Sequence, residues 1–438
     1  MGRSLVALLF ALLHSGDAAA ERVHWRNALW FDGARFVAGD RWSADGVFVE
    51  KPDPRRRGDG GPRVDRIVEL GGRHVVPAYG DAHHHGIDSD DGIDDKVTVF
   101  LEAGVFYVKN PNSIPELITP AVRAKLNRRS SIDVAFAHGG LTSPGGHPVP
   151  LHAYLASIGV FRGLKPEHME GRAYFTIADE AALDAKWPTI LAGKPDFIKT
   201  FLLFSDEGRE PLRRETDGIP HKGLDPAVLK AVVRKAHASG LRVSTHIDTA
   251  RDFEHAVDAG VDEVNHLPQP DPRFSADLAA YRIAPAVARK AASRGITVVT
   301  TASTTERLSP SLPVAWLNPM RRNQAGNLEV LLAAGVRIAI GSDGISGERR
   351  FVTARDEVKF ITDKRLLTPL QVLRAWSIDT PRAIFPARRL GGLEPGFEAD
   401  FLVLNGDPLD DPENLHRIGM RVKGGELLPY LPAIVLGR

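Results

Sequence analysis

A repeated unit of amphipathic helix, glycine and short apolar strand is the feature that most constrains the fold of this chain. In the clearest copy, Asp225 and Pro226 are typical of a helix start, Gly240 of a left-handed helix end, and 241–245 of a strand. A glycine between a helical segment and an apolar run recurs along the chain and helps to predict eight strands: 75–80, 105–109, 132–137, 197–201, 241–245, 261–265, 296–301 and 336–341. Strands that alternate with helices pair in parallel through right-handed crossovers.

Eight such units predict an α/β fold with a closed (β/α)8 TIM barrel over residues 78–385. The flanks, 21–77 and 386–438, alternate polar and apolar residues instead, so we expect them to pair into one small β-sandwich domain built from both chain ends. An open doubly wound sheet is the structural alternative. Such sheets usually carry a glycine-rich phosphate loop, and the chain has neither a G-x-G-x-x-G nor a Walker pattern.

Composition excludes several classes of function. Cysteine is absent, which excludes disulfides, thiolate zinc sites and cysteine nucleophiles. The formal net charge of +1 gives no reason to expect a nucleic-acid partner. No G-x-S-x-G elbow is present, which argues against a serine hydrolase.

The first 20 residues have the pattern of an export signal. Arg3 precedes a short apolar run, and Ala18-Ala19-Ala20 offers small residues for cleavage. We therefore expect residues 1–20 to be a signal peptide and the mature chain to be periplasmic or secreted. An irregular cytosolic N-terminus is the alternative. No later segment is long and apolar enough to predict a membrane span in the mature chain.

A set of polar residues lies at the same end of the predicted strands. His83 and His85 follow the first strand, and residues two apart on a strand share a face. The other members come from the fourth, fifth, sixth and eighth strands: Lys199, His246, His266 and Asp343. Taken singly, each is more often an ordinary packed, exposed or capping residue. Because strand ends of a barrel converge on one mouth, the set as a whole predicts a metal site with nitrogen and oxygen ligands, suited first to Zn²⁺ and then to Mn²⁺ or Co²⁺.

This pattern resembles that of the amidohydrolase superfamily, in its branch with two metal ions. The stretches that carry the resemblance are 81–85, with the two histidines, the residues Lys199, His246 and His266, and Gly341-Ser342-Asp343. One departure is Pro77-Ala78-Tyr79-Gly80, where these enzymes usually show Pro-Gly and two apolar residues.

The resemblance implies a role for each ligand. His83, His85 and Asp343 would bind the more buried ion, and His246 and His266 the second. Lys199 would be carboxylated to N6-carboxylysine and bridge two divalent ions. A hydroxide shared by the ions would attack a carbonyl, and Asp343 would carry the proton to the leaving group.

Candidate substrate contacts lie in two loops. The glycine-rich stretch 138–148 follows the third strand, and His147 or His138 is expected to contact substrate over the metals. A structural turn with incidental histidines is the alternative. Lys109 and Asn110 end the second strand and are expected to bind a substrate carboxylate or carbonyl.

Together these features predict a metal-dependent hydrolase acting on an amide bond of a small molecule, either peptide-like or cyclic, as the resemblance to prolidase-like and imidazolonepropionase-like enzymes implies. A lactonase or phosphotriesterase that uses the same site is one alternative, and a metal-binding protein without turnover is another. The sequence leaves the oligomeric state open, a homo-oligomer included.

Overall fold

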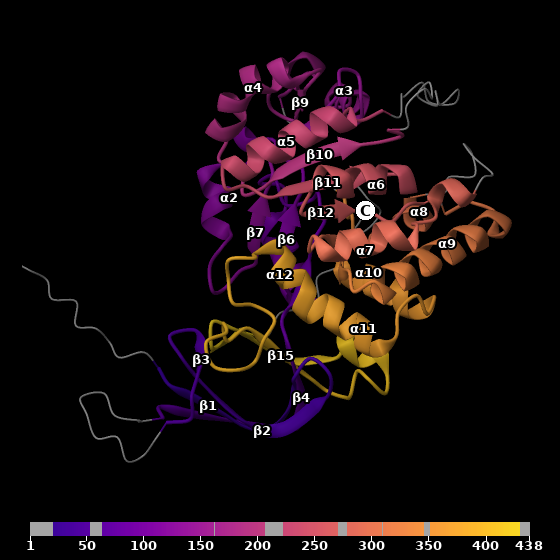
Figure 1. Ribbon diagram of the computed structural model, residues 1–438. Coiled ribbons are helices and arrows are strands. Elements are labelled where there is room, and N and C mark those ends of the chain that lie inside the picture. Colours follow the sequence, from indigo (N-terminus) through magenta and orange to yellow (C-terminus); the bar gives the residue numbers. More distant parts are fainter. Residues whose placement is uncertain are drawn as a thin grey trace, which may run out of the picture.

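The computed structural model describes residues 21–52, 64–161, 163–205, 222–269, 278–308, 310–345 and 351–429. The predicted signal peptide, residues 1–20, lies outside the described residues. Figure 1 shows the two parts of the molecule, a β-domain at the bottom and a strand-and-helix barrel above it.

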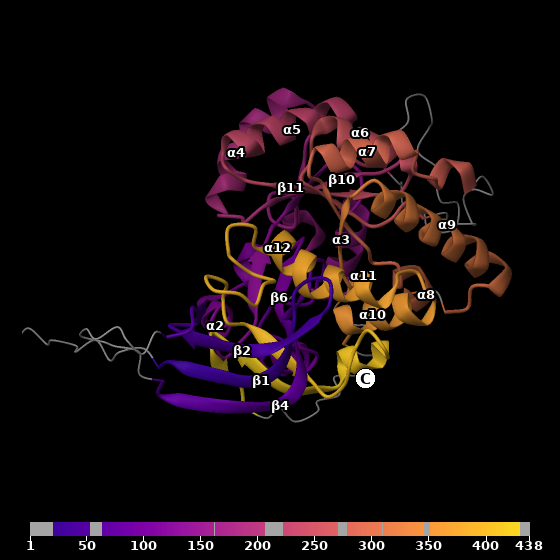
Figure 2. The same cartoon turned by 60° about the horizontal axis from the view of Figure 1, so that its bottom comes forward.

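The β-domain is one seven-stranded mixed sheet that contains both ends of the described chain. Its order is β17-β16-β15-β4-β1-β2-β3. The strands are β1 (Val23–Phe31), β2 (Phe36–Ala44), β3 (Val47–Val49), β4 (Arg66–Pro77), β15 (Phe401–Leu404), β16 (Ile418–Lys423) and β17 (Glu426–Leu427). Figure 2 shows β1, β2 and β4 side by side. The predicted pairing of the two flanks into a β-domain is confirmed.

Alternation of inward and outward side chains explains how this sheet forms a core. Trp25, Trp30, Phe48 and Phe401 are all buried and meet edge-on or stacked, with 4.9 Å between the ring centroids of Trp25 and Phe401. The sheet also bends back on itself, because the backbone of 397–399 bonds to that of 46–48. The two faces of the expected sandwich are therefore parts of one continuous sheet.

The barrel strands run in parallel and close into a ring. They are β5 (Tyr79–Asp81), β6 (Val105–Asn110), β7 (Asp133–Phe136), β8 (Gly140–Thr142), β10 (Ile198–Leu202), β11 (Val243–Ile247), β12 (Glu263–Asn265), β13 (Thr297–Val299) and β14 (Arg337–Ala339). The Ala82 N–H donates to the Ile340 carbonyl at 2.8 Å, which joins the first strand to the last. The predicted (β/α)8 barrel is confirmed.

The third strand differs from its prediction. The stretch 132–137 was expected to be one strand, but the barrel uses two short ones: β7 pairs with β6, and β8 pairs with β10. The chain turns between them at His138, whose φ is +62°. An additional strand, β9 (Tyr174–Thr176), pairs with β8.

Helices follow most barrel strands and cover them from outside (Figure 1). They are α1 (Ile93–Glu102), α2 (Pro120–Lys125), α3 (Val149–Ser157), α4 (Glu180–Ala192), α5 (Pro226–Ala238), α6 (Ala250–Ala259), α7 (Pro285–Ser293), α8 (Thr304–Leu308), α9 (Val314–Ala333), α10 (Ala354–Asp363), α11 (Pro369–Arg374) and α12 (Thr380–Ile384). As predicted, the Asp225 side chain caps α5, accepting from the Ala227 N–H at 2.8 Å. None of the helices in the described ranges is long and apolar enough to cross a membrane.

The β-domain and the barrel are joined where β4 continues into β5. β4 ends at Pro77 and β5 begins at Tyr79, and the intervening Ala78 donates its N–H to the Asp400 carbonyl at 3.1 Å. Trp376 supports this joint from a π-helical turn, 375–379. Its ring stacks on Tyr79 at 3.7 Å, and its indole N–H donates to the Gly80 carbonyl at 3.1 Å.

Candidate metal centre

Three of the predicted ligands meet at one point of the barrel mouth. The Nε2 atoms of His83 and His85 each lie 3.4 Å from the Asp343 Oδ1 atom, and 3.1 Å from each other. The two histidines follow β5, and Asp343 follows β14, the neighbouring strand in the ring. Their ligand atoms all lie within 4.8 Å of one another, close enough for one ion to be held between them.

Backbone contacts bring these two strand ends together. The Asp343 N–H donates to the His83 carbonyl at 2.7 Å. Gly341 allows the close approach, because a Cβ there would lie 2.8 Å from the His83 Cβ. Asp81 ties both strands by accepting from the His83 N–H at 3.3 Å and from the Ser342 N–H and hydroxyl at 2.9 and 2.7 Å. Burial raises the pKa of Asp81 to about 7, although these hydrogen bonds oppose the shift.

His246 and His266 form a second pair beside the first. Their ring centroids lie 4.4 Å apart, and that of His266 lies 4.8 Å from that of His83. The Nδ1 atom of His266 lies 2.7 Å from the Thr301 hydroxyl. Both His266 and Asp343 adopt left-handed backbone conformations, with φ of +76° and +49°. Such strain in residues other than glycine concentrates at functional sites.

Lys199 reaches this site from inside the barrel. It lies on β10, its side chain is fully buried, and its Nζ donates to the Asn265 Oδ1 atom at 3.4 Å. Burial lowers the pKa of Lys199 to about 7, and the negative charges of Asp343 and Glu263 oppose this shift without cancelling it. Near neutral pH a large fraction of the amine is therefore uncharged.

Burial also keeps two of the imidazoles neutral. It lowers the pKa of His83 and of His266 well below the usual range, and the nearby Lys199 and His246 act in the same direction. Burial alone would raise the pKa of Asp343, but its hydrogen bond with His85 and the adjacent His83 and His266 hold that pKa well below the usual range. Neutral imidazoles and an ionised carboxylate are the forms that bind metal.

The donor atoms fit a divalent cation. His83 Nδ1 contacts the Asn265 Oδ1 atom, which can only accept, so the proton lies on Nδ1 and the lone pair of Nε2 faces the Asp343 oxygen. Two electron-rich atoms 3.4 Å apart with no proton between them repel each other, and a cation between them removes the repulsion. Imidazole and carboxylate donors without sulfur suit Zn²⁺, Mn²⁺ or Co²⁺.

His147 lies beside the second histidine pair. Its ring stacks on His246 with centroids 5.4 Å apart and meets Phe201 edge-on at 5.3 Å. The preceding Gly146 fits tightly under the loop, since a Cβ there would lie 2.7 Å from the Lys222 carbonyl oxygen. Of the two histidines predicted in this loop, His147 is the one that reaches the site.

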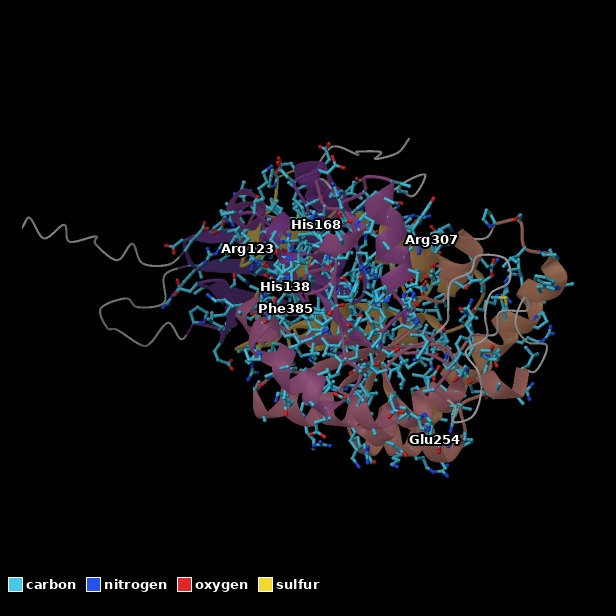
Figure 3. All side chains as sticks on the ribbon, turned by 90° about the horizontal axis from the view of Figure 1, so that it is seen from above. Arg123, His138, His168, Glu254, Arg307 and Phe385 are labelled. Atoms are coloured by element: carbon cyan, nitrogen blue, oxygen red, sulfur yellow. The ribbon has the colours of Figure 1, made fainter. Side chains whose placement is uncertain are left out.

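His138 lies elsewhere. Its Nδ1 atom is 3.1 Å from the Ser113 hydroxyl, and it lines a separate cavity of about 340 Å³. Seen from above in Figure 3, it lies well apart from Arg307, whose guanidinium donates to the Asp343 carbonyl at 3.0 Å. The expectation that His138 contacts substrate over the metals is corrected, because the left-handed turn after β7 carries the side chain away.

The end of the second strand also differs from its prediction. Lys109 is buried, and its ammonium pairs with the Glu263 carboxylate at 2.8 Å inside the barrel. The expected substrate contact of Lys109 is corrected for this reason. Asn110 is fully buried, and its Nδ2 has no hydrogen-bond partner among the residues that the structure describes. Its substrate contact stays a prediction.

Sequence reasoning missed the polar residues that support the ligands from behind. These are Ser244, Glu263, Asn265 and Thr301, which contact one another or the ligands. A signal was present in Glu263-Val264-Asn265: two polar residues alternate on a strand that lies in the ring, so both face the barrel interior.

Comparisons with known proteins indicate the family of the chain. A family model described as "Amidohydrolase family" matches residues 212–428. An ochratoxinase of Aspergillus niger is 26% identical over 191 residues, which is 43% of this chain and 37% of that protein. This chain therefore matches little more than a third of the ochratoxinase sequence. An imidazolonepropionase of Deinococcus radiodurans is 24% identical over 378 residues, 79% of this chain and 81% of that protein.

Solved structures share the fold. A crystal structure of A. niger ochratoxinase superposes with a TM-score of 0.69 and 18% identity, covering 93% of this chain and 96% of that one. A prolidase complexed with N-methylphosphonate-L-proline gives a TM-score of 0.68 and 19% identity, covering 93% and 99%. The barrel, the arrangement of histidines and aspartate at its mouth, and the family match lead to one conclusion: the chain belongs to the amidohydrolase superfamily.

Proposed function

We propose that this chain is a metal-dependent hydrolase that cleaves an amide bond, peptide-like or cyclic, in a small molecule. The observation that carries the proposal is the meeting of His83, His85 and Asp343 at one mouth of the barrel, with His246 and His266 beside them. Catalytic residues of such barrels gather at the strand ends that form this mouth. The family match supports an amide as the bond that is broken.

The donor set supports two divalent ions, with Zn²⁺ as our first choice. His83, His85 and Asp343 would hold one ion and His246 and His266 the other. Lys199, as N6-carboxylysine, would bridge them. Bound divalent metal would polarise the substrate carbonyl and lower the pKa of a coordinated water to about 7.

The surroundings of Lys199 support its carboxylation. Because burial lowers its pKa to about 7, the uncharged amine is available at neutral pH. Its Nζ would form a bond to the carbon of CO₂ and release a proton, which leaves an anionic carbamate. The neighbouring Asn265 oxygen holds the Nζ in place at 3.4 Å.

Asp343 is the group that we assign to proton transfer. Its carboxylate is ionised near neutral pH, so it can accept a proton as the water oxygen adds to the scissile carbonyl carbon. It would return this proton to the leaving nitrogen as the carbon–nitrogen bond breaks. His147, which stacks on His246, is the side chain that we expect to contact the substrate.

Metal analysis combined with a substrate panel tests the proposal. The purified protein should contain stoichiometric divalent metal, and chelation should abolish turnover that added Zn²⁺, Mn²⁺ or Co²⁺ restores. The panel should contain dipeptides, N-acyl amino acids, cyclic amides, lactones and phosphotriesters. Turnover of lactones or phosphotriesters alone would replace the amide class, and a protein that neither holds metal nor responds to it would refute the proposal.

A pair of histidine variants tests the substrate contact. His147→Ala should change the order of preference among the amides of the panel while metal content stays the same. His168→Ala is the matched control, because His168 is an exposed histidine on the short helix Pro166–His168 (Figure 3). Equal preferences in the two variants would remove His147 from the site.

We also propose that the chain is exported and that residues 1–20 are removed. Expression of the full chain in a Gram-negative host should give a mature N-terminus near Glu21 in the periplasmic fraction. An uncleaved N-terminus in the cytosolic fraction would contradict the proposal.

A further inference from the structure

Beneath the metal ligands, inside the barrel, lies a chain of four buried polar side chains. They come from three strands, and each residue as a whole is at most 4% exposed: Lys109, Ser244, Glu263 and Asn265. The Lys109 ammonium contacts one Glu263 oxygen at 2.8 Å, and the Ser244 hydroxyl donates to the other at 2.8 Å. The Asn265 amide nitrogen donates to the Ser244 oxygen at 2.5 Å. The chain ends where the Asn265 oxygen contacts His83 and Lys199.

The direction of each hydrogen bond among these four side chains follows from the negative charge of Glu263. An ionised carboxylate only accepts, so the Ser244 proton must point to Glu263. The Ser244 oxygen is then left as an acceptor, so the Asn265 amide must turn its NH₂ towards it. The Thr245 carbonyl, 3.4 Å from the same nitrogen, favours the same orientation.

The last bond transmits this orientation to a metal ligand. With its NH₂ directed to Ser244, Asn265 presents its oxygen to the Nδ1 atom of His83. That nitrogen must then carry the proton. The other ring nitrogen, Nε2, is left with its lone pair directed at the Asp343 side of the site.

We propose that Glu263, acting through Ser244 and Asn265, fixes His83 in the tautomer whose Nε2 lone pair faces the metal position. Glu263 and Asn265 are thus positioning residues for the first metal ion. Lys109 keeps a positive charge against Glu263 and so holds it in the accepting form. The inference rests on the metal site of the proposed function, and it assigns a task to residues that hold no metal themselves.

Glu263→Gln makes a specific test, because it should reverse the whole chain. The Lys109 ammonium requires an acceptor, so the glutamine would turn its oxygen to Lys109 and its NH₂ to Ser244. Ser244 would then donate to Asn265, whose amide would flip and direct its NH₂ at His83 Nδ1. The proton of His83 would move to Nε2, which then points an N–H at the metal position.

Two measurements detect this reversal of the hydrogen bonds without an activity assay. The first is the tautomer of His83 in the metal-free protein, read from imidazole ¹⁵N shifts and assigned by their loss in His83→Ala. The second is Zn²⁺ affinity, measured by competition with a chromophoric chelator. Glu263→Gln should shift the tautomer to Nε2–H and weaken Zn²⁺ binding by about 10- to 100-fold, the range typical of groups that orient metal-bound histidines.

A second substitution distinguishes this relay from a simple loss of charge. Adding Ser244→Ala to Glu263→Gln removes the reversed donor, so Asn265 can return its oxygen to His83 and Lys199, and Zn²⁺ affinity should recover. At the other end of the network, Asn265→Leu removes the acceptor of the His83 proton and should weaken Zn²⁺ binding as Glu263→Gln does. This variant tests the inference even if Glu263→Gln does not fold.

Two results would overturn the inference alone: folded Asn265→Leu with wild-type Zn²⁺ affinity, or a Glu263→Gln/Ser244→Ala variant that binds as weakly as Glu263→Gln. A wild-type protein that binds no divalent metal would instead overturn the proposed function and this inference together.

Discussion

The Lys109–Glu263 ion pair offers the sharpest test of how the barrel interior is stabilised. Its atoms lie 2.8 Å apart, and the two side chains are 5% and 3% exposed. Glu263→Gln keeps the shape of the side chain and removes the charge, which leaves the Lys109 ammonium buried without a counter-ion. Breaking a buried pair from one side is strongly destabilising, because the remaining charge has lost both water and partner.

The size of the effect can be bounded in two ways. With an effective dielectric constant of about 20, two unit charges 2.8 Å apart attract by about 6 kcal/mol. Breaking a buried ion pair by removing one partner typically costs about 3–5 kcal/mol. We therefore expect Glu263→Gln to lower the free energy of unfolding by about 3–5 kcal/mol.

Urea denaturation of the metal-free protein at pH 7 measures this loss without a contribution from metal binding. Lys109→Met should be destabilising for the same reason, and the double variant Lys109→Met/Glu263→Gln should lose at least 2 kcal/mol less than the sum of the two single losses, roughly the coupling expected of residues in direct contact. A loss below about 1 kcal/mol for Glu263→Gln, or strict additivity in the double variant, would refute the view that the two charges stabilise each other.

Three further outcomes can be measured by the same denaturation. Burial raises the pKa of Asp400 to about 6, so the folded state takes up a proton as pH falls through 6, before the unfolded chain does near 4. The free energy of unfolding should therefore rise by up to about 3 kcal/mol as pH falls over this range. Asp400→Asn, which can keep its contact with Tyr107, should remove that rise, and an unchanged pH profile in this variant would contradict the assignment. Trp376→Ala should lose about 3–5 kcal/mol because the indole is fully buried on Tyr79, and a loss below 1.5 kcal/mol would show that the joint relaxes around the cavity. Asp252→Ala should lower the free energy of unfolding by about 3 kcal/mol or more, because this buried carboxylate accepts from four backbone N–H groups of two loops at the barrel mouth. A near-neutral effect would mean that water replaces the carboxylate.

The fold was predictable because its signals are local. The cap at Asp225, the glycine at 240 and the apolar run after it describe a complete unit within residues 225–245, and the structure contains α5 and β11 there. The third strand was predicted less well, because its division depends on the left-handed turn at His138. Gly139 and Gly140 indicate a turn nearby, but they do not show that His138 itself adopts the left-handed conformation, which depends on the packing around it.

The metal ligands and their supporting residues differ in the same way. His83, His85 and Asp343 follow from position alone, because strand ends of a barrel must meet. Lys109 has the same position, yet its partner Glu263 lies 154 residues away in the sequence. No local pattern links the two, so a substrate contact and an interior ion pair could not be distinguished before the register of the strands was known.

The central place of β4 has a consequence for how the chain is made. One edge of this strand pairs with β1, which is synthesised earlier, but the other pairs with β15, so that Pro77 faces Phe401. Roughly 320 residues must leave the ribosome between these two, which takes about 16–65 s at ordinary rates of synthesis. For that time the strand that leads directly to the first histidines has an open edge, to which chaperones that recognise extended chain can bind.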